Sequence, residues 1–222
     1  EVVLGSTAKK DAITTLESLA PEGKKYWKYS GFSFLTGVLI LSFYCVVVGW
    51  ILNYIVIAAT SLPSNIGEAE KVFLGLLKED ISSQITYYTI AFALIAYTIS
   101  KGIKKGIETL NNILMPSLLI ILLIMFFYSM TLEGFQQAVE FMFMPNFEKF
   151  HASSIILAVG HAFFTLSVGM VTIMTYSASL GKEVNLVKTS ILVVTLDTLI
   201  AIIAGLIIFS IVYTAGQEPG KG

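Results

Sequence analysis

The chain has 222 residues and a formal net charge of −1 at pH 7; 55% of its residues are hydrophobic and 13% are charged. Soluble domains average about 45–50% apolar and about 25% charged residues, so this composition excludes a soluble globular protein and predicts an integral helical membrane protein. The near-neutral charge argues against a nucleic acid partner, and a single cysteine, Cys45, excludes a disulfide within the chain.

Five apolar segments are predicted to cross the membrane as helices. One crossing needs about 20 predominantly apolar residues. The predicted spans are 32–59, 84–100, 112–132, 153–180 and 186–213. Together they form a single transmembrane domain, residues 1–222, which is predicted to be an internal part of a longer protein.

Polar segments precede the first span and connect the others. Residues 9–21, KKDAITTLESLAP, are predicted to form a short surface helix. Residues 60–83 and 133–152 are predicted as acidic loops, the first with some helical pattern. Residues 101–106, KGIKKG, are predicted as a tight basic turn.

The lysines predict the orientation in the membrane. Ten of the fourteen lysines lie in residues 1–31, 101–106 and 181–188, and the chain contains no arginine. Because loops on the cytoplasmic side carry an excess of basic residues, these three segments are predicted to lie inside the cell. The first span then runs outward, the fourth inward and the fifth outward.

Asp197 is the only Asp, Glu or Lys deep within any predicted span. An ionised side chain at the bilayer centre costs about 2.5–3.5 kcal/mol on insertion scales, and such residues normally face a cavity and a partner. The position therefore predicts a cation site or a proton relay. The alternative is a structural aspartate that is hydrogen-bonded and protonated.

The fourth span carries small polar residues where an ordinary spanning helix would carry leucine. Its centre, FFTLSVG, includes Thr165, Ser167 and Gly169. This pattern suits a helix that is broken at mid-membrane, where freed carbonyls and hydroxyls can hold a cation and a small substrate. A continuous helix with small residues for close packing is the alternative.

Several stretches, in the right order, resemble one transporter family. FFTLSVG is similar to the sixth, interrupted helix of the neurotransmitter:sodium symporter family. The other stretches that resemble this family are EVVLGS at the end of its second helix, SFYCVVVGWILNYI in its third, GIETLNNILMP in its fifth, TLDTLIAIIAGLIIF in its seventh, and GQEPGKG in the loop that follows.

The resemblance implies an all-α integral membrane protein with a leucine-transporter-type fold, of which this chain holds five transmembrane helices, one interrupted. It implies a sodium-coupled symporter that imports an amino acid, or a similar small amine or carboxylate, by alternating access. Na⁺ would be the co-transported ion, with no organic cofactor. The protein would be multi-pass in the plasma or inner membrane, in contact with the lipid bilayer, and would not be an enzyme.

The resemblance also implies a sodium site at Thr165 and Asp197. Asp197 stands where the family often has a sodium-binding asparagine, and Ala201 stands where chloride-dependent members carry a serine. A fixed carboxylate beside sodium could compensate cation charge as bound chloride does elsewhere, so transport is predicted to be independent of chloride. Proton antiport through Asp197 is a weaker companion hypothesis. If Thr165 is not a ligand, its hydroxyl is expected to bond to a carbonyl one turn earlier.

Residues of the third and sixth helices are implied to contact the substrate. Tyr44 would bind a substrate carboxylate, and Ile40 would share its helix face. The implied contacts in the sixth helix are the backbone at Ser167 and Gly169 and the side chains of Phe164, Thr165 and Met170. On composition alone, Tyr44 and Phe164 would be packing residues.

Three further residues are implied to take part in gating. Gly106 and Pro116 match a motif with nine intervening residues at the inner end of the fifth helix, where both residues weaken the helix. His161 stands where a glutamine is usual near the external gate, which predicts pH-sensitive gating. Val171 replaces a frequent glycine and reduces backbone freedom there.

Other classes of protein remain as alternatives. A transporter of the same fold could carry a substrate that is not an amino acid. An ion channel would expect a filter loop or rings of polar residues, and a structural membrane subunit would need neither. A membrane enzyme would want clustered His and Asp, whereas the chain has only His151 and His161.

Overall fold

Helices are the only regular elements in the part of the chain that the structure describes. The computed structural model describes residues 1–144, 147, 150–181 and 183–220. Its α-helices are α1 (Val2–Ala8), α2 (Ala12–Ser18), α3 (Phe34–Thr60), α4 (Ile66–Lys78), α5 (Ile81–Ser100), α6 (Thr109–Ser129), α7 (Phe135–Phe143), α8 (Ala152–Thr165), α9 (Thr172–Ser177) and α10 (Leu186–Thr214). A 3₁₀ helix at Lys25–Ser33 leads into α3, and a π-helix at Ile103–Glu108 leads into α6.

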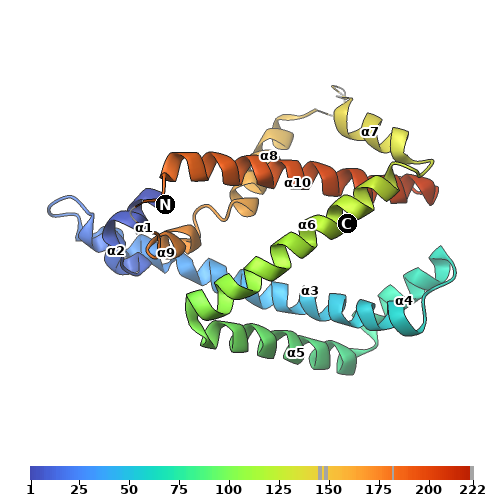
Figure 1. The fold of residues 1–222 in the computed structure, drawn as a ribbon, viewed down its shortest axis with the longest axis horizontal. Coiled ribbons are helices and arrows are strands. Elements are labelled where there is room, and N and C mark those ends of the chain that lie inside the picture. Colours follow the sequence, from blue (N-terminus) through green and yellow to red (C-terminus); the bar gives the residue numbers. More distant parts are fainter. Residues whose placement is uncertain (145–146, 148–149, 182, 221–222) are drawn as a thin grey trace. The chain divides into compact units, whose positions relative to one another are not determined.

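The helices drawn in Figure 1 belong to two units, each of which has its own internal packing. The first unit is Glu1–Phe34 with Met115–Gly222, and it holds α1, α2, α7, α8, α9, α10 and most of α6. The second unit is Leu35–Leu114, with α4, α5 and nearly all of α3. The predicted residues Thr165 and Asp197 therefore share the first unit.

In the second unit, small residues let α3 lie against the backbone of α5. Gly49 is buried, and a Cβ there would come 3.0 Å from the backbone nitrogen of Tyr88. Cys45, one turn earlier on α3, and Ala91 on α5 are each 1% exposed. Small side chains of this kind permit membrane helices to approach closely.

The predicted helical pattern between the first two spans is α4. The Asn65 side chain accepts a hydrogen bond from the backbone N–H of Glu68 at 2.9 Å, and the Glu68 carboxylate accepts one from the N–H of Ser64 at 2.8 Å. These reciprocal bonds satisfy donors that a helix start leaves free. The Gln84 side chain of α5 donates to the Leu76 carbonyl and ties the end of α4 to α5.

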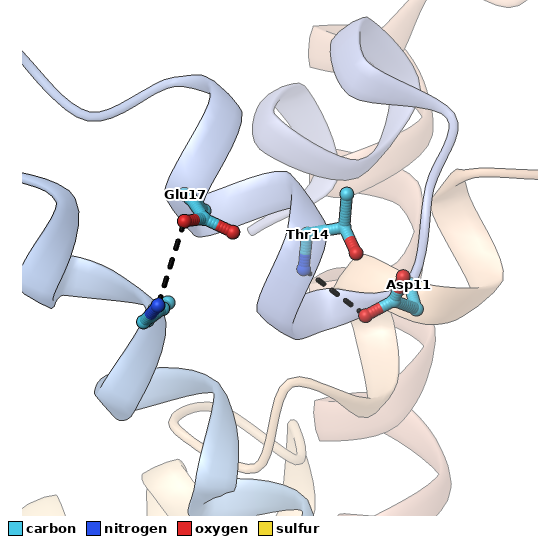
Figure 2. Close-up of polar contacts among 4 residues, drawn as sticks. Asp11, Thr14 and Glu17 are labelled. Atoms are coloured by element: carbon cyan, nitrogen blue, oxygen red, sulfur yellow. Dashed lines mark hydrogen bonds and ion pairs between the residues drawn. The ribbon is translucent and has the colours of Figure 1, made fainter.

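The predicted surface helix of the first unit is α2, which starts at an aspartate cap. The Asp11 carboxylate accepts a hydrogen bond from the N–H of Thr14 at 3.0 Å (Figure 2). Hydrogen bonds from the Thr14 side chain and backbone lower the pKa of Asp11 below its ordinary value of 3.8. Glu17 pairs with Lys28 of the 3₁₀ helix at 3.5 Å, and both side chains are more than one-third exposed, so this pair stabilises the fold little.

The loop prediction for residues 133–152 is wrong at α7. The segment was predicted as a loop because of its acidic residues, but it contains a helix with an apolar face that packs on α10 (Figure 1). The Phe141 ring lies edge-on to the Phe209 ring, with centroids 4.8 Å apart. At the start of α7, the Gly134 N–H donates a hydrogen bond to the Thr214 hydroxyl at 3.0 Å.

The basic turn predicted at 101–106 is only partly a turn. Gly102 has φ +78°, in the left-handed region that favours glycine, and the π-helix begins at the next residue. Gly106 is buried in this π-helix, where a Cβ would run into the carbonyl oxygen of Thr98. The close approach to α5 thus requires glycine at position 106. The π-helix takes up four of the six residues of the predicted turn.

Three helical stretches among the described residues are long and apolar enough to cross a membrane. They are Lys25–Thr60, Lys105–Ser129 and Leu186–Thr214, and they overlap the first, third and fifth predicted spans. Helix α8 is apolar but shorter. Helix α5 has 20 residues but begins with the polar run ISSQIT, and the predicted span at 84–100 stays a prediction.

Candidate functional site

The chain leaves the helical conformation between Thr165, the last residue of α8, and Thr172, the first of α9. This interrupted segment, residues 166–171, lies within the predicted fourth span. Three of its residues have left-handed backbones: Ser167 and Val171 at φ 53°, and Gly169 at φ 87°. Because such angles cannot continue a right-handed helix, they end α8 and redirect the chain into α9.

The interruption releases backbone carbonyls. Among the described residues, no hydrogen bond is donated to the carbonyls of residues 165–169. Carbonyl oxygens freed in this way are the groups with which broken membrane helices coordinate sodium or protons. The segment therefore offers a run of oxygen ligands that an unbroken helix would have used internally.

A glutamate holds the interrupted segment from the side of α1. The Gly169 N–H donates a hydrogen bond to Glu1 Oε1 at 2.6 Å. The second oxygen, Oε2, is buried and has no hydrogen-bond partner among the described residues. Gly5 lets α1 lie directly against α9, because a Cβ at this position would overlap the carbonyl oxygen of Met174 on α9. Helix α1 thus carries a carboxylate to the interrupted segment.

A cavity of about 500 Å³ lies against this segment, and we call it the Asp197 cavity. Its walls come from the end of α8, the interrupted segment, α9, α10 and α1. Thr165, Ser167 and Asp197 line it together. The other polar lining residues are Thr172, Tyr176, Ser177, Thr189 and Ser190. The other half of the lining residues are aliphatic, so the polar groups share the cavity with an apolar wall.

The oxygen groups of this cavity are of the kind that small hard cations prefer as ligands. Asp197 is half-buried on α10, and among the described residues its carboxylate has no hydrogen-bond or ion-pair partner. The Thr165 hydroxyl donates to the Ala162 carbonyl at 3.3 Å, as expected for a threonine that bonds back along its helix. A hydroxyl that donates still has lone pairs with which to accept a cation. The described residues contain no group of three or more His, Cys, Asp or Glu side chains arranged for a metal ion, so a cation here would rely on hydroxyl and carbonyl oxygens beside one carboxylate.

Several site residues were not predicted. In the sequence, Glu1 belongs to the EVVLGS resemblance, which does not predict its bond to Gly169, because the two residues lie far apart along the chain. Ser190 and Val193, by contrast, lie seven and four residues before Asp197 on α10. Helical periodicity could have assigned them to the face of Asp197.

The other predicted site residues do not line the Asp197 cavity. Gly169 and the half-buried Met170 lie in the interrupted segment, while the exposed Phe164 and His161 lie on α8. Ile40 and Tyr44 lie on α3 in the second unit. The two predicted gating residues of the fifth helix are Gly106, buried in the π-helix, and Pro116, exposed within α6.

Comparisons with known proteins point to one family. The model of the sodium:neurotransmitter symporter family matches residues 70–221. The whole chain is 34% identical to an uncharacterized sodium-dependent transporter of Haemophilus influenzae and 31% identical to one of Bacillus subtilis, covering 51% and 49% of those proteins. It is 29% identical to an uncharacterized sodium-dependent transporter of Methanocaldococcus jannaschii, of which it covers 47%. The chain thus spans about half the length of the curated relatives that it matches.

Proposed function

Because the chain belongs to the sodium:neurotransmitter symporter family and comes from a multi-pass membrane protein, we propose that the full-length protein is a sodium-coupled symporter that imports an amino acid or a similar small amine or carboxylate. The observation that carries this proposal is the Asp197 cavity, where an interrupted helix and an intramembrane carboxylate meet. The names of the relatives support sodium dependence and a transporter rather than an enzyme.

Sodium is one of the transported species. In the proposal, the Asp197 carboxylate and the Thr165 oxygens hold it, because a single carboxylate in an apolar wall lowers the energy of a cation there. Ser167 and Gly169 contribute backbone groups to the substrate. Binding of both then favours closure, and the sodium gradient drives uphill uptake by alternating access.

The remaining predicted residues are assigned to the same cycle. Tyr44 and Ile40 on α3, with Phe164 and Met170, would complete the substrate contacts. Gly106 and Pro116 would let the start of α6 unwind for release to the inside, and π-helices occur frequently at functional sites. His161 would make the outer gate sensitive to pH.

Chloride is not required in this proposal. Asp197 supplies the negative charge beside sodium, and Ala201, one turn later on α10, has no hydroxyl to hold chloride. Replacing chloride with gluconate is therefore expected to leave uptake unchanged, and a several-fold loss would contradict this part of the proposal. Proton antiport through Asp197 would be indicated by an alkaline shift of the vesicle interior that accompanies sodium entry, because each proton released by Asp197 leaves the vesicle.

The test is uptake by the full-length protein in proteoliposomes. A panel of radiolabelled amino acids is offered with an inward sodium gradient, and with sodium replaced by choline. We expect saturable, sodium-dependent accumulation of at least one amino acid. Asp197→Ala should abolish it, whereas Glu70→Ala, which removes an exposed carboxylate from α4, should leave uptake unchanged.

Three outcomes distinguish an amino-acid symporter from a channel and from a transporter of another substrate class. Accumulation above the external concentration excludes a channel, which only equilibrates its ion. Sodium-dependent thermal stabilisation without uptake of any amino acid would retain the sodium site and move the substrate to another class. Neither uptake nor sodium-dependent stabilisation would overturn the symporter proposal.

A further inference from the structure

A second cavity lies in the other unit, where α5 gives way to α6. It measures about 190 Å³, well above the ~30 Å³ that one water molecule occupies in the liquid. Its lining residues come from the end of α5, from Lys101, from the π-helix and from the first turns of α6, and the cavity is open on one side. We call it the Lys101–Lys105 cavity, after the two lysines that line it.

The charge of this cavity is positive throughout. Among its described lining residues, Lys101 and Lys105 are charged and none is acidic. Neither lysine forms an ion pair within the described part of the chain. The Lys101 ammonium lies 4.2 Å from the centre of the Tyr97 ring, which holds one cation at the wall of the cavity by a cation–π contact.

Part of the cavity wall is apolar and belongs to a helix that is long and apolar enough to span a membrane. Leu110 and Ile113 of α6 line the cavity and are 41% and 62% exposed. They lie in the stretch Lys105–Ser129, which is long and apolar enough to span a bilayer. The cavity therefore joins two cationic groups to a surface that suits acyl chains.

The lysine distribution predicts that this cavity lies at the cytoplasmic face, where the inner leaflet supplies anionic headgroups. Lysine binds phosphate as a point charge, and basic pockets between transmembrane helices on this side are suited to lipid headgroups. We propose that the Lys101–Lys105 cavity binds the phosphate of an anionic phospholipid of the inner leaflet. This site is separate from the Asp197 cavity and does not depend on what the protein transports.

The test titrates the purified full-length protein with short-chain phosphatidylglycerol in a neutral detergent and follows the thermal-unfolding midpoint. Phosphatidylcholine of the same chain length and inorganic phosphate are titrated in parallel. We expect phosphatidylglycerol to raise the midpoint more than either. In the double variant Lys101→Gln/Lys105→Gln, the concentration of phosphatidylglycerol that gives half of the full shift should rise about thirtyfold. This follows because each lysine near an anionic headgroup contributes about 1 kcal/mol to binding.

Two further variants keep the result interpretable. Lys71→Gln/Lys78→Gln removes two exposed lysines from α4 and should leave the titration unchanged. Lys101→Arg/Lys105→Arg keeps both charges and should retain the response, which separates loss of charge from loss of fold. An unchanged response in the glutamine variant would overturn the proposal. Equal, lysine-dependent stabilisation by inorganic phosphate would replace the lipid with a free anion and also overturn it.

Discussion

Val171 is a β-branched residue held in a conformation that suits glycine. Its φ is 53° and ψ is 6°, yet only 6% of the residue is exposed. It packs with Ala12, Leu16 and Met174 in a small core between α2 and α9. The left-handed backbone costs about 1–2 kcal/mol, whereas burial of a valine side chain contributes about 1.5–3 kcal/mol. The two contributions are of similar size, so burial offsets the strain, which lies at the end of the interrupted segment.

This balance predicts an unusual order of stabilities for two variants. Val171→Ala loses two methyl groups but keeps the strain, while Val171→Gly loses slightly more apolar surface but relieves it. We expect both to be less stable than the native protein, with Val171→Gly up to about 1 kcal/mol more stable than Val171→Ala. Thermal unfolding of the full-length protein in detergent measures the order.

A pair of variants on a regular helix provides the comparison. Val72 lies within α4 and is half-buried. There, Val72→Ala should be more stable than Val72→Gly by about 0.5–1 kcal/mol, because glycine loses more backbone freedom in a helix. The same order at position 171 would mean that Val171 does not adopt a left-handed backbone in the protein.

At the scale of the elements, the contact between α1 and α9 depends on a single glycine. The Gly5→Ala change places a Cβ over the carbonyl oxygen of Met174, so α1 must move away from α9. We expect a loss of about 1–3 kcal/mol in stability, as is usual when a well-packed contact is overfilled. The same movement takes Glu1 away from the Gly169 N–H, so sodium-dependent uptake should fall more than stability alone explains.

Gly75→Ala is the matched control for this prediction. Gly75 lies inside α4, and a Cβ there would meet nothing within 4 Å. The alanine should be neutral or stabilising by up to about 1 kcal/mol, because it reduces the freedom of the unfolded chain. Equal thermal midpoints for the two variants would contradict close packing of α1 on α9.

The same contacts explain what the sequence could and could not predict. Apolar length indicated three of the membrane helices, and the small polar residues of FFTLSVG indicated the interruption, because both signals are local. The nine residues of α7 were missed although Phe135, Ala138, Val139 and Met142 recur with a helical period. What the sequence does not show is that Phe141 of this helix packs on Phe209 and Tyr213 of α10. The role of Glu1 likewise rests on a hydrogen bond to Gly169, 168 residues away. Long-range pairings of this kind leave no periodic trace in a sequence.

At the scale of the whole molecule, the distribution of lysine predicts one orientation. Ten of fourteen lysines fall in the segments assigned to the inside, among them Lys24 and Lys105. Lys71, on α4, falls outside. Inversion would place most of the basic residues on the far side of the membrane, against the bias that governs insertion. The orientation matters for both proposals, because it decides which gate opens to the cytoplasm and which leaflet meets the Lys101–Lys105 cavity.

Single cysteines report this orientation directly. The native Cys45 is 1% exposed. It is changed to serine, together with any other cysteine of the full-length protein, so that only the introduced cysteines can react with the label. In intact cells, a membrane-impermeant maleimide should label Lys71→Cys but neither Lys24→Cys nor Lys105→Cys. After the membrane is permeabilised, all three should react, since Lys24, Lys71 and Lys105 are exposed. Labelling of Lys105→Cys in intact cells would reverse the assigned orientation. The lipid proposed for the Lys101–Lys105 cavity would then have to come from the outer leaflet. That leaflet lacks the anionic surface that attracts lysines on the cytoplasmic side.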